Sequence, residues 1–438
     1  MEIFLTLAYL LLFLHIINKW KFFTNKWITK RKLKLFFILK FIVGLLLFWI
    51  YSNHYSNFKY NRHDADIFKY FDDSEHIYNS LPEKPLDFTK IILGIDFDKD
   101  YFSNEYYINM NNWDNHYNSH LFNDARAIIR VNSMMRIFSF GYYYIHILFF
   151  CFLGFIGLFA LFKTFTIFFP KKENWLFYAL FLTPTVLFWS SGVLKEPLML
   201  YSLGFTLYYI KMKLNPKHVF FNLINFILCI SILFFLKFYA FLILLTLLIP
   251  FKLNLHKSFK NKLIPYLFSF ALFSTIAIIM GFVNPKLNLL SLIDQKQDSF
   301  ISETKYKNSG SYFEITNIEP NIESIIKVIP EAIINSFTRP LIWNVNSIIQ
   351  LPAALENILF LTLIFLASID VYRKRMQLKV DLNFIIFCLT FVLLNFIIIG
   401  IITPVSGALI RYKMIALPFL IMLILHTINL ERFNLKKK

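Results

Sequence analysis

Two carboxylates stand at the start of the first long polar segment of the chain. Asp64 and Asp66 occur in the sequence His63-Asp64-Ala65-Asp66, within about fifteen residues of the end of an apolar run. A carboxylate held near a membrane surface can take a proton from an acceptor hydroxyl, which is the work of a general base. The alternative for either residue is a solvated loop position or the N-cap of an amphipathic, membrane-surface helix expected over Ile67–Leu81. The neighbouring Asp72 and Asp73 are expected to be surface charges.

Cationic side chains occur in four further segments, and each has the chemistry of a phosphate ligand. Arg126 and Arg130 are four residues apart, so they share one face of a predicted helix. The remaining candidates are Lys195, Arg339 and Arg411. Arginine and lysine stabilise the negative charge that develops on a departing phosphate.

Each cation also has a structural explanation. Arg126 and Arg130 could reach toward lipid headgroups. Lys195 could pair with its neighbour Glu196, and Arg339 could stack on Trp343 as a cation–π pair.

The composition defines the setting of these residues. The chain of 438 residues is 57% hydrophobic and 16% charged, whereas soluble proteins are about 45–50% apolar and about 25% charged. This excludes an ordinary soluble enzyme, a disordered chain and a disulfide scaffold. The three cysteines lie in apolar runs and are expected to be small buried hydrophobes.

The fold class expected is all-α, a polytopic transmembrane bundle of about eleven spans. The regions are two N-terminal spans (1–51), a first extracytoplasmic segment (52–141), spans 3–8 (142–283), a second extracytoplasmic segment (284–347), and spans 9–11 with a basic tail (348–438). Seven of the expected spans cover about residues 1–18, 35–51, 142–162, 264–283, 348–369, 382–402 and 414–430. The other four form two hairpins of two spans each, within 175–210 and 219–251.

The basic residues orient the bundle. They concentrate in the short loops, which places these loops in the cytoplasm, the N-terminus outside and the C-terminus inside the plasma (inner) membrane. The net charge of +18 is therefore attributed to membrane orientation, and nucleic acid is not expected as a partner.

The two hairpins are short for a membrane. The arms within Trp175–Ile210 have about 17 residues each, or about 25 Å of helix, against about 30 Å of hydrocarbon. The turn Ser190–Pro197 should then lie below the outer surface, and a helix starting at Pro197 would point its amides toward Lys195. Lys237 lies in the turn of the second hairpin. Because a charge at this depth costs about 2.5–3.5 kcal/mol, we expect both lysines to face a polar cavity or to reach the headgroups.

Three stretches resemble a known family. DADIFKYFDDSEHIY resembles the start of the first extracytoplasmic loop of the GT-C superfamily of polytopic glycosyltransferases, and LTPTVLFWSSGVLKEPLML and SGALIRYK resemble segments of bacterial GT-C-like and polysaccharide-polymerase-like proteins. The acid of the family normally follows the first span, whereas here it follows the second.

The resemblance implies a large extracytoplasmic loop with membrane-parallel helices and transfer of a sugar from a polyprenyl-phosphate-linked donor to a glycan, lipid or protein acceptor. Asp64 or Asp66 would be the base, with phosphate held by Arg126, Arg130, Lys195, Arg339 and Arg411. No cofactor or metal is required, and the acids of the loop are compatible with a divalent cation.

Two other functions stay open. An O-antigen or exopolysaccharide polymerase would act on polyprenyl-diphosphate-linked glycans and rely on arginines. A transporter of lipid-linked glycans, or an assembly subunit, would form no bond; transporters favour polar residues at mid-membrane and inverted repeats, and the sequence shows neither clearly.

Overall fold

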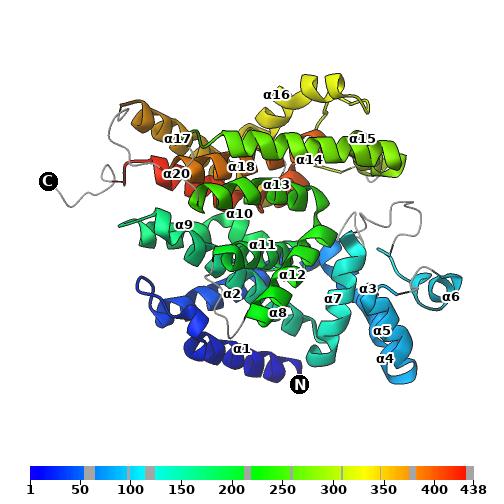
Figure 1. Ribbon diagram of the computed structural model, residues 1–438. Coiled ribbons are helices and arrows are strands. Elements are labelled where there is room, and N and C mark those ends of the chain that lie inside the picture. Colours follow the sequence, from blue (N-terminus) through cyan, green and yellow to red (C-terminus); the bar gives the residue numbers. More distant parts are fainter. Residues whose placement is uncertain are drawn as a thin grey trace. The chain divides into compact units, whose positions relative to one another are not determined.

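The computed structural model describes residues 1–53, 65–95, 99–113, 124–211, 219–256, 260–306, 309–345, 347–373 and 381–430. These residues are mostly helical, and they contain no β-strand beyond an isolated bridge between Tyr312 and Val405. Two compact units are formed, the first from Met1–Phe165 with Leu187–Phe238 and the second from Thr166–Val186 with Tyr239–Lys438. Figure 1 labels their helices.

Eight helices of the described chain are long and apolar enough to cross a membrane, or nine if one bent pair is counted as a single span. The eight are Glu2–Lys19, Lys30–Asn53, Tyr143–Phe168, Val219–Leu236, Phe238–Leu255, Ile264–Val283, Ile348–Arg373 and Leu382–Ile402. The prediction of an all-helical, multi-pass membrane protein is confirmed at this level.

The first unit is built around one deeply buried helix, α8. Its helices are α1 (Glu2–Lys19), α2 (Lys30–Asn53), α3 (Asp66–Tyr78), α4 (Ser80–Glu83), α5 (Pro85–Leu93), α6 (Asp100–Phe102), α7 (Asp124–Ser139), α8 (Tyr143–Phe165), α11 (Lys195–Lys211) and α12 (Val219–Leu236). α8 packs against α1, α2, α7 and α11. The backbones of α8 and α11 touch at Gly157 and Gly204: a Cβ atom added to Gly204 would lie 2.2 Å from the Gly157 carbonyl oxygen.

The predicted first hairpin is interrupted. Its first arm is divided into α9 (Glu173–Leu182) and α10 (Pro184–Trp189), because Pro184 has no N–H to donate to the preceding turn. Its second arm, α11, begins at Lys195 and not at Pro197 as expected. The helix can begin before Pro197 because proline is tolerated in the first helical turn, where its missing N–H costs no hydrogen bond.

The non-helical residues 190–194 are packed against α2 and α8. The buried Lys40 of α2 donates hydrogen bonds to the hydroxyls of Ser190 and Ser191. A Cβ atom added at Gly44 would lie 2.4 Å from the Ser191 carbonyl oxygen, and one at Gly154 would lie 2.8 Å from that of Ser190. Two glycines and one ammonium group therefore hold the segment that leads into Lys195.

The amphipathic helix expected over Ile67–Leu81 forms as α3, but its apolar face does not face lipid. Phe68 and Phe71 are buried and contact the ring of Tyr143 on α8, and α3 packs along α7 (Figure 1). The prediction of a helix is confirmed, and its apolar stripe packs on α7 and α8 instead of being left for lipid.

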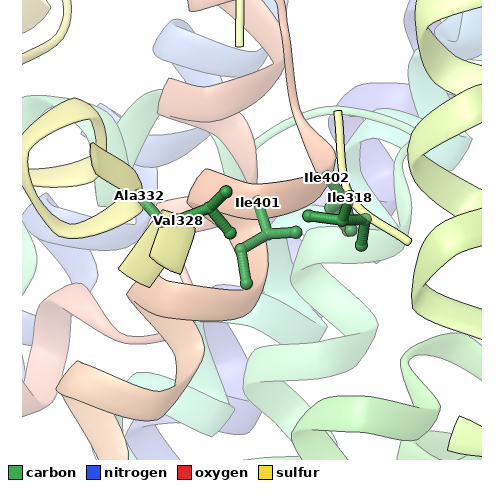
Figure 2. Close-up of a cluster of buried hydrophobic side chains, with 5 residues drawn as sticks. All are labelled: Ile318, Val328, Ala332, Ile401 and Ile402. Carbon is green, nitrogen blue, oxygen red and sulfur yellow. The ribbon is translucent and has the colours of Figure 1, made fainter. Parts of the chain in front are cut away.

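The second unit contains the remaining long helices. These are α9, α13 (Phe238–His256), α14 (Ile264–Val283), α15 (Leu289–Tyr306), α16 (Ile322–Thr338), α17 (Leu351–Arg373), α18 (Leu382–Ile402), α19 (Ser406–Lys413) and α20 (Leu417–Thr427). α16 packs on α18, where Figure 2 shows an apolar cluster of Ile318, Val328, Ala332, Ile401 and Ile402.

The last predicted span, 414–430, is replaced by a bent pair. α19 and α20 meet at 63°, with Pro418 in the first turn of α20. Arg411 and Lys413 both lie on α19.

Candidate anion-binding site

The turn lysines of the two hairpins meet at one carboxylate in the first unit. Lys195 Nζ lies 2.8 Å from Asp124 Oδ1, and Lys237 Nζ lies 3.5 Å from Asp124 Oδ2. Asp124 is the first residue of α7, Lys195 is the first residue of α11, and Lys237 lies between α12 and α13. We call these three residues the lysine cradle.

The partner of Lys195 in the structure differs from the one suggested by the sequence. The Lys195 ammonium group pairs with Asp124 and not with the adjacent Glu196. It also lies 4.9 Å from the centre of the Tyr70 ring, a cation–π contact supplied by α3. The lysine side chains are 10% and 11% exposed, whereas Asp124 is 24% exposed, so solvent reaches the carboxylate more easily than either ammonium group.

Arg126 and Arg130 share one face of α7, as predicted, and both stack on Trp113. Their Cζ atoms lie 5.3 and 5.2 Å from the centre of its ring. The ring of Trp113 also stacks on that of Tyr107, with ring centres 4.3 Å apart. Arg130 Nε also donates a hydrogen bond of 2.7 Å to the carbonyl oxygen of Ile91. Protein contacts thus hold these arginines, in place of the headgroup contacts considered from the sequence.

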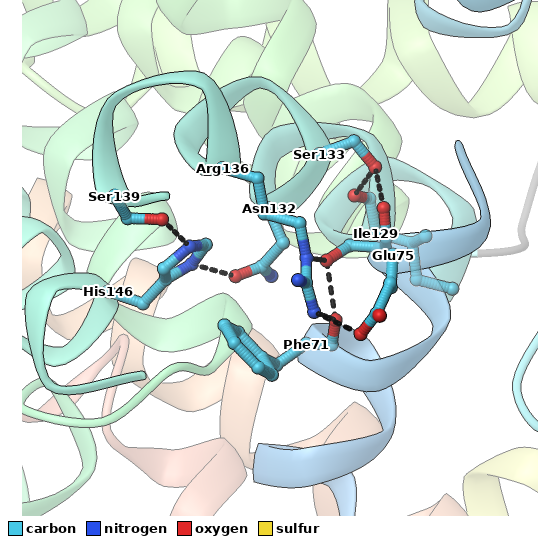
Figure 3. Close-up of polar contacts among 9 residues, drawn as sticks. Phe71, Glu75, Ile129, Asn132, Ser133, Arg136, Ser139 and His146 are labelled. Atoms are coloured by element: carbon cyan, nitrogen blue, oxygen red, sulfur yellow. Dashed lines mark hydrogen bonds and ion pairs between the residues drawn. The ribbon is translucent and has the colours of Figure 1, made fainter. Parts of the chain in front are cut away.

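A third arginine of α7, which sequence reasoning missed, ties α7 to α3 (Figure 3). Arg136 donates to the Phe71 carbonyl oxygen and to Ser74 Oγ, each at 2.8 Å, and lies 3.4 Å from a carboxylate oxygen of Glu75. Burial lowers the pKa of Arg136, and the charge of Glu75 opposes that shift. Arg136 therefore fixes the helix that carries Asp124, Arg126 and Arg130.

A hydrogen-bonded chain of serine, histidine and asparagine links α7 to α8 (Figure 3). Ser139 Oγ lies 2.7 Å from His146 Nε2, and His146 Nδ1 lies 2.9 Å from Asn132 Oδ1. This order resembles a nucleophile with its base and orienting group. All three residues have no exposed surface, so the chain is a packing contact between helices.

The predicted catalytic acids are only partly placed. Asp64 lies outside the described residues. Asp66 is half-buried and begins α3, four residues before Tyr70. The N-cap of α3 is Ala65, so Asp66 is not the cap considered from the sequence.

Asp73, expected at the surface, is buried. Its two carboxylate oxygens accept hydrogen bonds of 2.8 and 2.7 Å from the backbone N–H groups of Asn111 and Asn112. Burial raises the pKa of Asp73, and those two hydrogen bonds oppose the shift. The expectation was wrong because Asp73 fastens the segment that leads to Trp113.

The second unit holds the other two predicted phosphate ligands. Arg339 follows α16; its Cζ atom lies 4.2 Å from the centre of the Phe313 ring, and its Nε donates to Asn335 Oδ1 at 2.8 Å. The stacking partner is therefore Phe313 and not Trp343, whose side chain is 79% exposed. Arg411 is half-buried on α19.

A buried lysine that the sequence did not single out connects these two segments. Lys413 of α19 donates to the carbonyl oxygen of Arg339 at 3.0 Å and to Asn357 Oδ1 at 3.2 Å. Glu356, which precedes Asn357 on α17, is buried and accepts a hydrogen bond of 2.7 Å from the backbone N–H of Thr185. The sequence did hold a signal for Lys413 and Glu356, because both charges lie within or next to apolar segments, where a charge is costly without polar partners.

The predicted phosphate ligands fall into two groups, one in each unit. Lys195 meets α7, which carries Arg126 and Arg130, in the first unit, and Arg339 is joined to α19, which carries Arg411, in the second. Among the described residues, no three histidine, cysteine or acidic side chains are placed to hold a metal ion.

No protein-family model, curated protein or solved structure matches this chain. The chemistry of the first group rests on its own residues. Two ammonium groups and a helix with two guanidinium groups suit a phosphate, and the rings of Tyr70 and Trp113 provide apolar faces beside these cations.

Proposed function

We propose that the protein is a membrane glycosyltransferase of the GT-C type. It transfers a sugar from a polyprenyl-phosphate-linked donor to a glycan, lipid or protein acceptor at the extracytoplasmic face. One observation carries the proposal: lysines from two separate hairpin turns converge on one site beside the arginine-bearing helix α7. Charges placed inside apolar segments and gathered at one point favour binding of an anionic head group at the membrane.

The topology of the proposal has eleven spans. Two are added to the eight long helices and the bent pair, namely α9 with α10 as a broken span, and α11. The N-terminus and both long polar segments lie outside the plasma membrane, and the C-terminus lies in the cytoplasm, because the basic loops then face inward.

The reaction follows from the roles of the side chains. The bond between the sugar's anomeric carbon and a phosphate oxygen breaks, and a bond to the acceptor oxygen forms. Asp66 or Asp64 takes the proton of the acceptor hydroxyl. Lys195, with Arg126 and Arg130, stabilises the negative charge on the departing lipid phosphate.

The test uses the full-length protein in lipid nanodiscs with radiolabelled polyprenyl-phosphate sugars. Wild-type protein should transfer label to an acceptor, and Lys195→Gln and Asp66→Asn should each reduce the rate by at least about a hundredfold, the size of effect seen when an electrostatic or acid–base group is removed. Lys327→Gln is the matched control, because Lys327 is 71% exposed and pairs only one turn away, with Glu323. Full activity of Lys195→Gln, or no transfer from any donor, would reject the proposal.

The second group favours one alternative, a polymerase of polyprenyl-diphosphate-linked glycans that depends on arginines. Its support is the hydrogen bond from Lys413 to the backbone carbonyl oxygen of Arg339. Lys413 lies on α19, which also carries Arg411, so the bond joins the segments of two predicted phosphate ligands. Full activity of Asp64→Asn and Asp66→Asn, with loss in Arg339→Ala or Arg411→Ala, would favour the polymerase. Movement of a lipid-linked glycan without bond formation would instead favour a transporter.

A further inference from the structure

The carboxylate of Asp124 is divided between two ammonium groups. Each of its oxygens faces one lysine, Oδ1 toward Lys195 at 2.8 Å and Oδ2 toward Lys237 at 3.5 Å. The second distance exceeds that of a normal hydrogen bond, so the contact between Lys237 and Asp124 is an ion pair without a close hydrogen bond. One carboxylate therefore pairs with two ammonium groups.

The three side chains differ in their access to solvent. Both lysines are about nine-tenths buried, and Asp124 is 24% exposed. Removing an ion from water is costly unless an opposite charge replaces the water, so the two lysines need an anion whenever no ligand is bound. Asp124 supplies that charge. As the most exposed member of the cradle, its side chain would also lose the least buried contact on rotating toward solvent.

A phosphate group matches the position that Asp124 occupies. The phosphodiester of a lipid-linked sugar carries one negative charge and two terminal oxygens, so it can accept from both ammonium groups at once. The lipid monophosphate that departs after sugar transfer gains a third terminal oxygen and up to one further negative charge. Arg126 lies two residues from Asp124 at the start of α7, and Arg130 follows one turn later. Because residues two apart on a helix do not face each other, these arginines add positive charge to α7 from a different face than that of Asp124.

We propose that Asp124 is an exchangeable counter-ion: it keeps Lys195 and Lys237 paired while the cradle is empty, and a phosphate group displaces it. This deepens the proposed function, because the phosphate would be that of the lipid donor. The opposing explanation is a permanent ion pair that only joins α7 to α11. The two explanations predict opposite signs when the carboxylate is removed.

The experiment measures binding to the purified full-length protein in nanodiscs by isothermal titration calorimetry. The probes are farnesyl phosphate, inorganic phosphate and farnesol, which lacks the phosphate. Asp124→Asn should bind farnesyl phosphate about fivefold more tightly than wild type, since a partly exposed ion pair of about 1 kcal/mol no longer competes. Lys195→Gln should bind it more weakly, and farnesol should gain nothing.

Glu105→Gln is the matched control. Glu105 pairs with Lys84 at 2.7 Å in the same unit and shares no residue with the cradle, so its removal should leave binding unchanged. A second comparison covers the case in which Asp124→Asn does not fold. The double variant Asp124→Asn/Lys237→Gln removes one charge of each sign and should bind farnesyl phosphate more tightly than Lys237→Gln alone.

Weaker or unchanged binding in both carboxylate-free variants would overturn the counter-ion proposal. An equal gain for inorganic phosphate would show that the cradle recognises phosphate alone, and a gain confined to farnesyl phosphate would assign it to a lipid head group. If Asp124→Asn binds farnesyl phosphate more tightly but the protein transfers no sugar, only the glycosyltransferase proposal is rejected. If the protein transfers sugar but Asp124→Asn binds farnesyl phosphate more weakly, only the counter-ion proposal is rejected.

Discussion

The ammonium group of Lys413 donates a hydrogen bond of 3.0 Å to the backbone carbonyl oxygen of Arg339. The same nitrogen donates to Asn357 Oδ1, and Asn357 in turn donates to the carbonyl oxygen of Pro340 at 3.0 Å. Lys413 is 3% exposed. One buried cation on α19 thus contacts the end of α16 through the backbone oxygen of Arg339, which any side chain at 339 would present, and contacts α17 through the side-chain oxygen of Asn357.

Lys413→Met should lower the stability of the second unit. The substitution keeps most of the volume but removes two hydrogen bonds from a charged donor, and it leaves two buried acceptors unsatisfied, a loss of about 1–3 kcal/mol. Thermal unfolding of the detergent-solubilised protein would register it as a lower midpoint. Lys286→Met, at an exposed position of the same unit, should change the midpoint little. Equal midpoints for the two variants would contradict the role of Lys413.

Replacing Trp113 should loosen both arginines of α7. Each guanidinium group lies over its ring, and such contacts contribute about 0.5–2 kcal/mol each, most for tryptophan. Affinity for farnesyl phosphate should therefore fall in the order wild type, Trp113→Phe, Trp113→Leu. Trp343→Leu is the control, because Trp343 is 79% exposed. Equal affinity in Trp113→Leu and wild type would show that the stacking does not position the arginines for a ligand.

The sequence predicted the ends of some helices well because hydropathy changes sharply there. Both ends of α14 and α18 coincide with the expected spans 264–283 and 382–402. The break between α19 and α20 was missed, since apolar residues continue through it and Pro418 sits where a helix tolerates proline.

The lysines of the cradle were predictable as charges inside apolar hairpins, but their partner was not. Asp124 lies far away in the sequence, and its contact with Lys195 and Lys237 depends on how α7, α11 and α12 pack. Trp113 escaped prediction for the same reason, because its role comes from tertiary contacts and leaves no local pattern.

The buried Asp73 should make stability depend on pH. Its pKa is raised above the ordinary value of 3.8, so the folded protein holds this proton more tightly than the unfolded chain. Its contribution to stability is therefore greatest at low pH and declines as pH rises from 3.8 through the raised pKa. Asp73→Asn lacks the titrating group, so wild type should lose stability relative to this variant across that window. A difference that is constant with pH, measured by thermal unfolding, would contradict this assignment.

The contact between α8 and α11 should tolerate no added methyl group. A Cβ atom at Gly157 would lie 2.4 Å from the carbonyl oxygen of Leu200, and one at Gly204 would lie 2.2 Å from that of Gly157. The obstructing atoms are backbone, so the helices must separate, and we expect Gly157→Ala and Gly204→Ala each to cost about 1–3 kcal/mol, as overpacking does.

The same separation would move the start of α11 and hence Lys195, so farnesyl phosphate binding should weaken together with the unfolding midpoint. Gly310→Ala is the matched control, since a Cβ atom there would have no heavy atom within 4 Å. Because small residues let membrane helices approach closely, Gly157→Ser should destabilise at least as much as Gly157→Ala. A midpoint for either alanine variant equal to that of Gly310→Ala would show that the two backbones are not in contact.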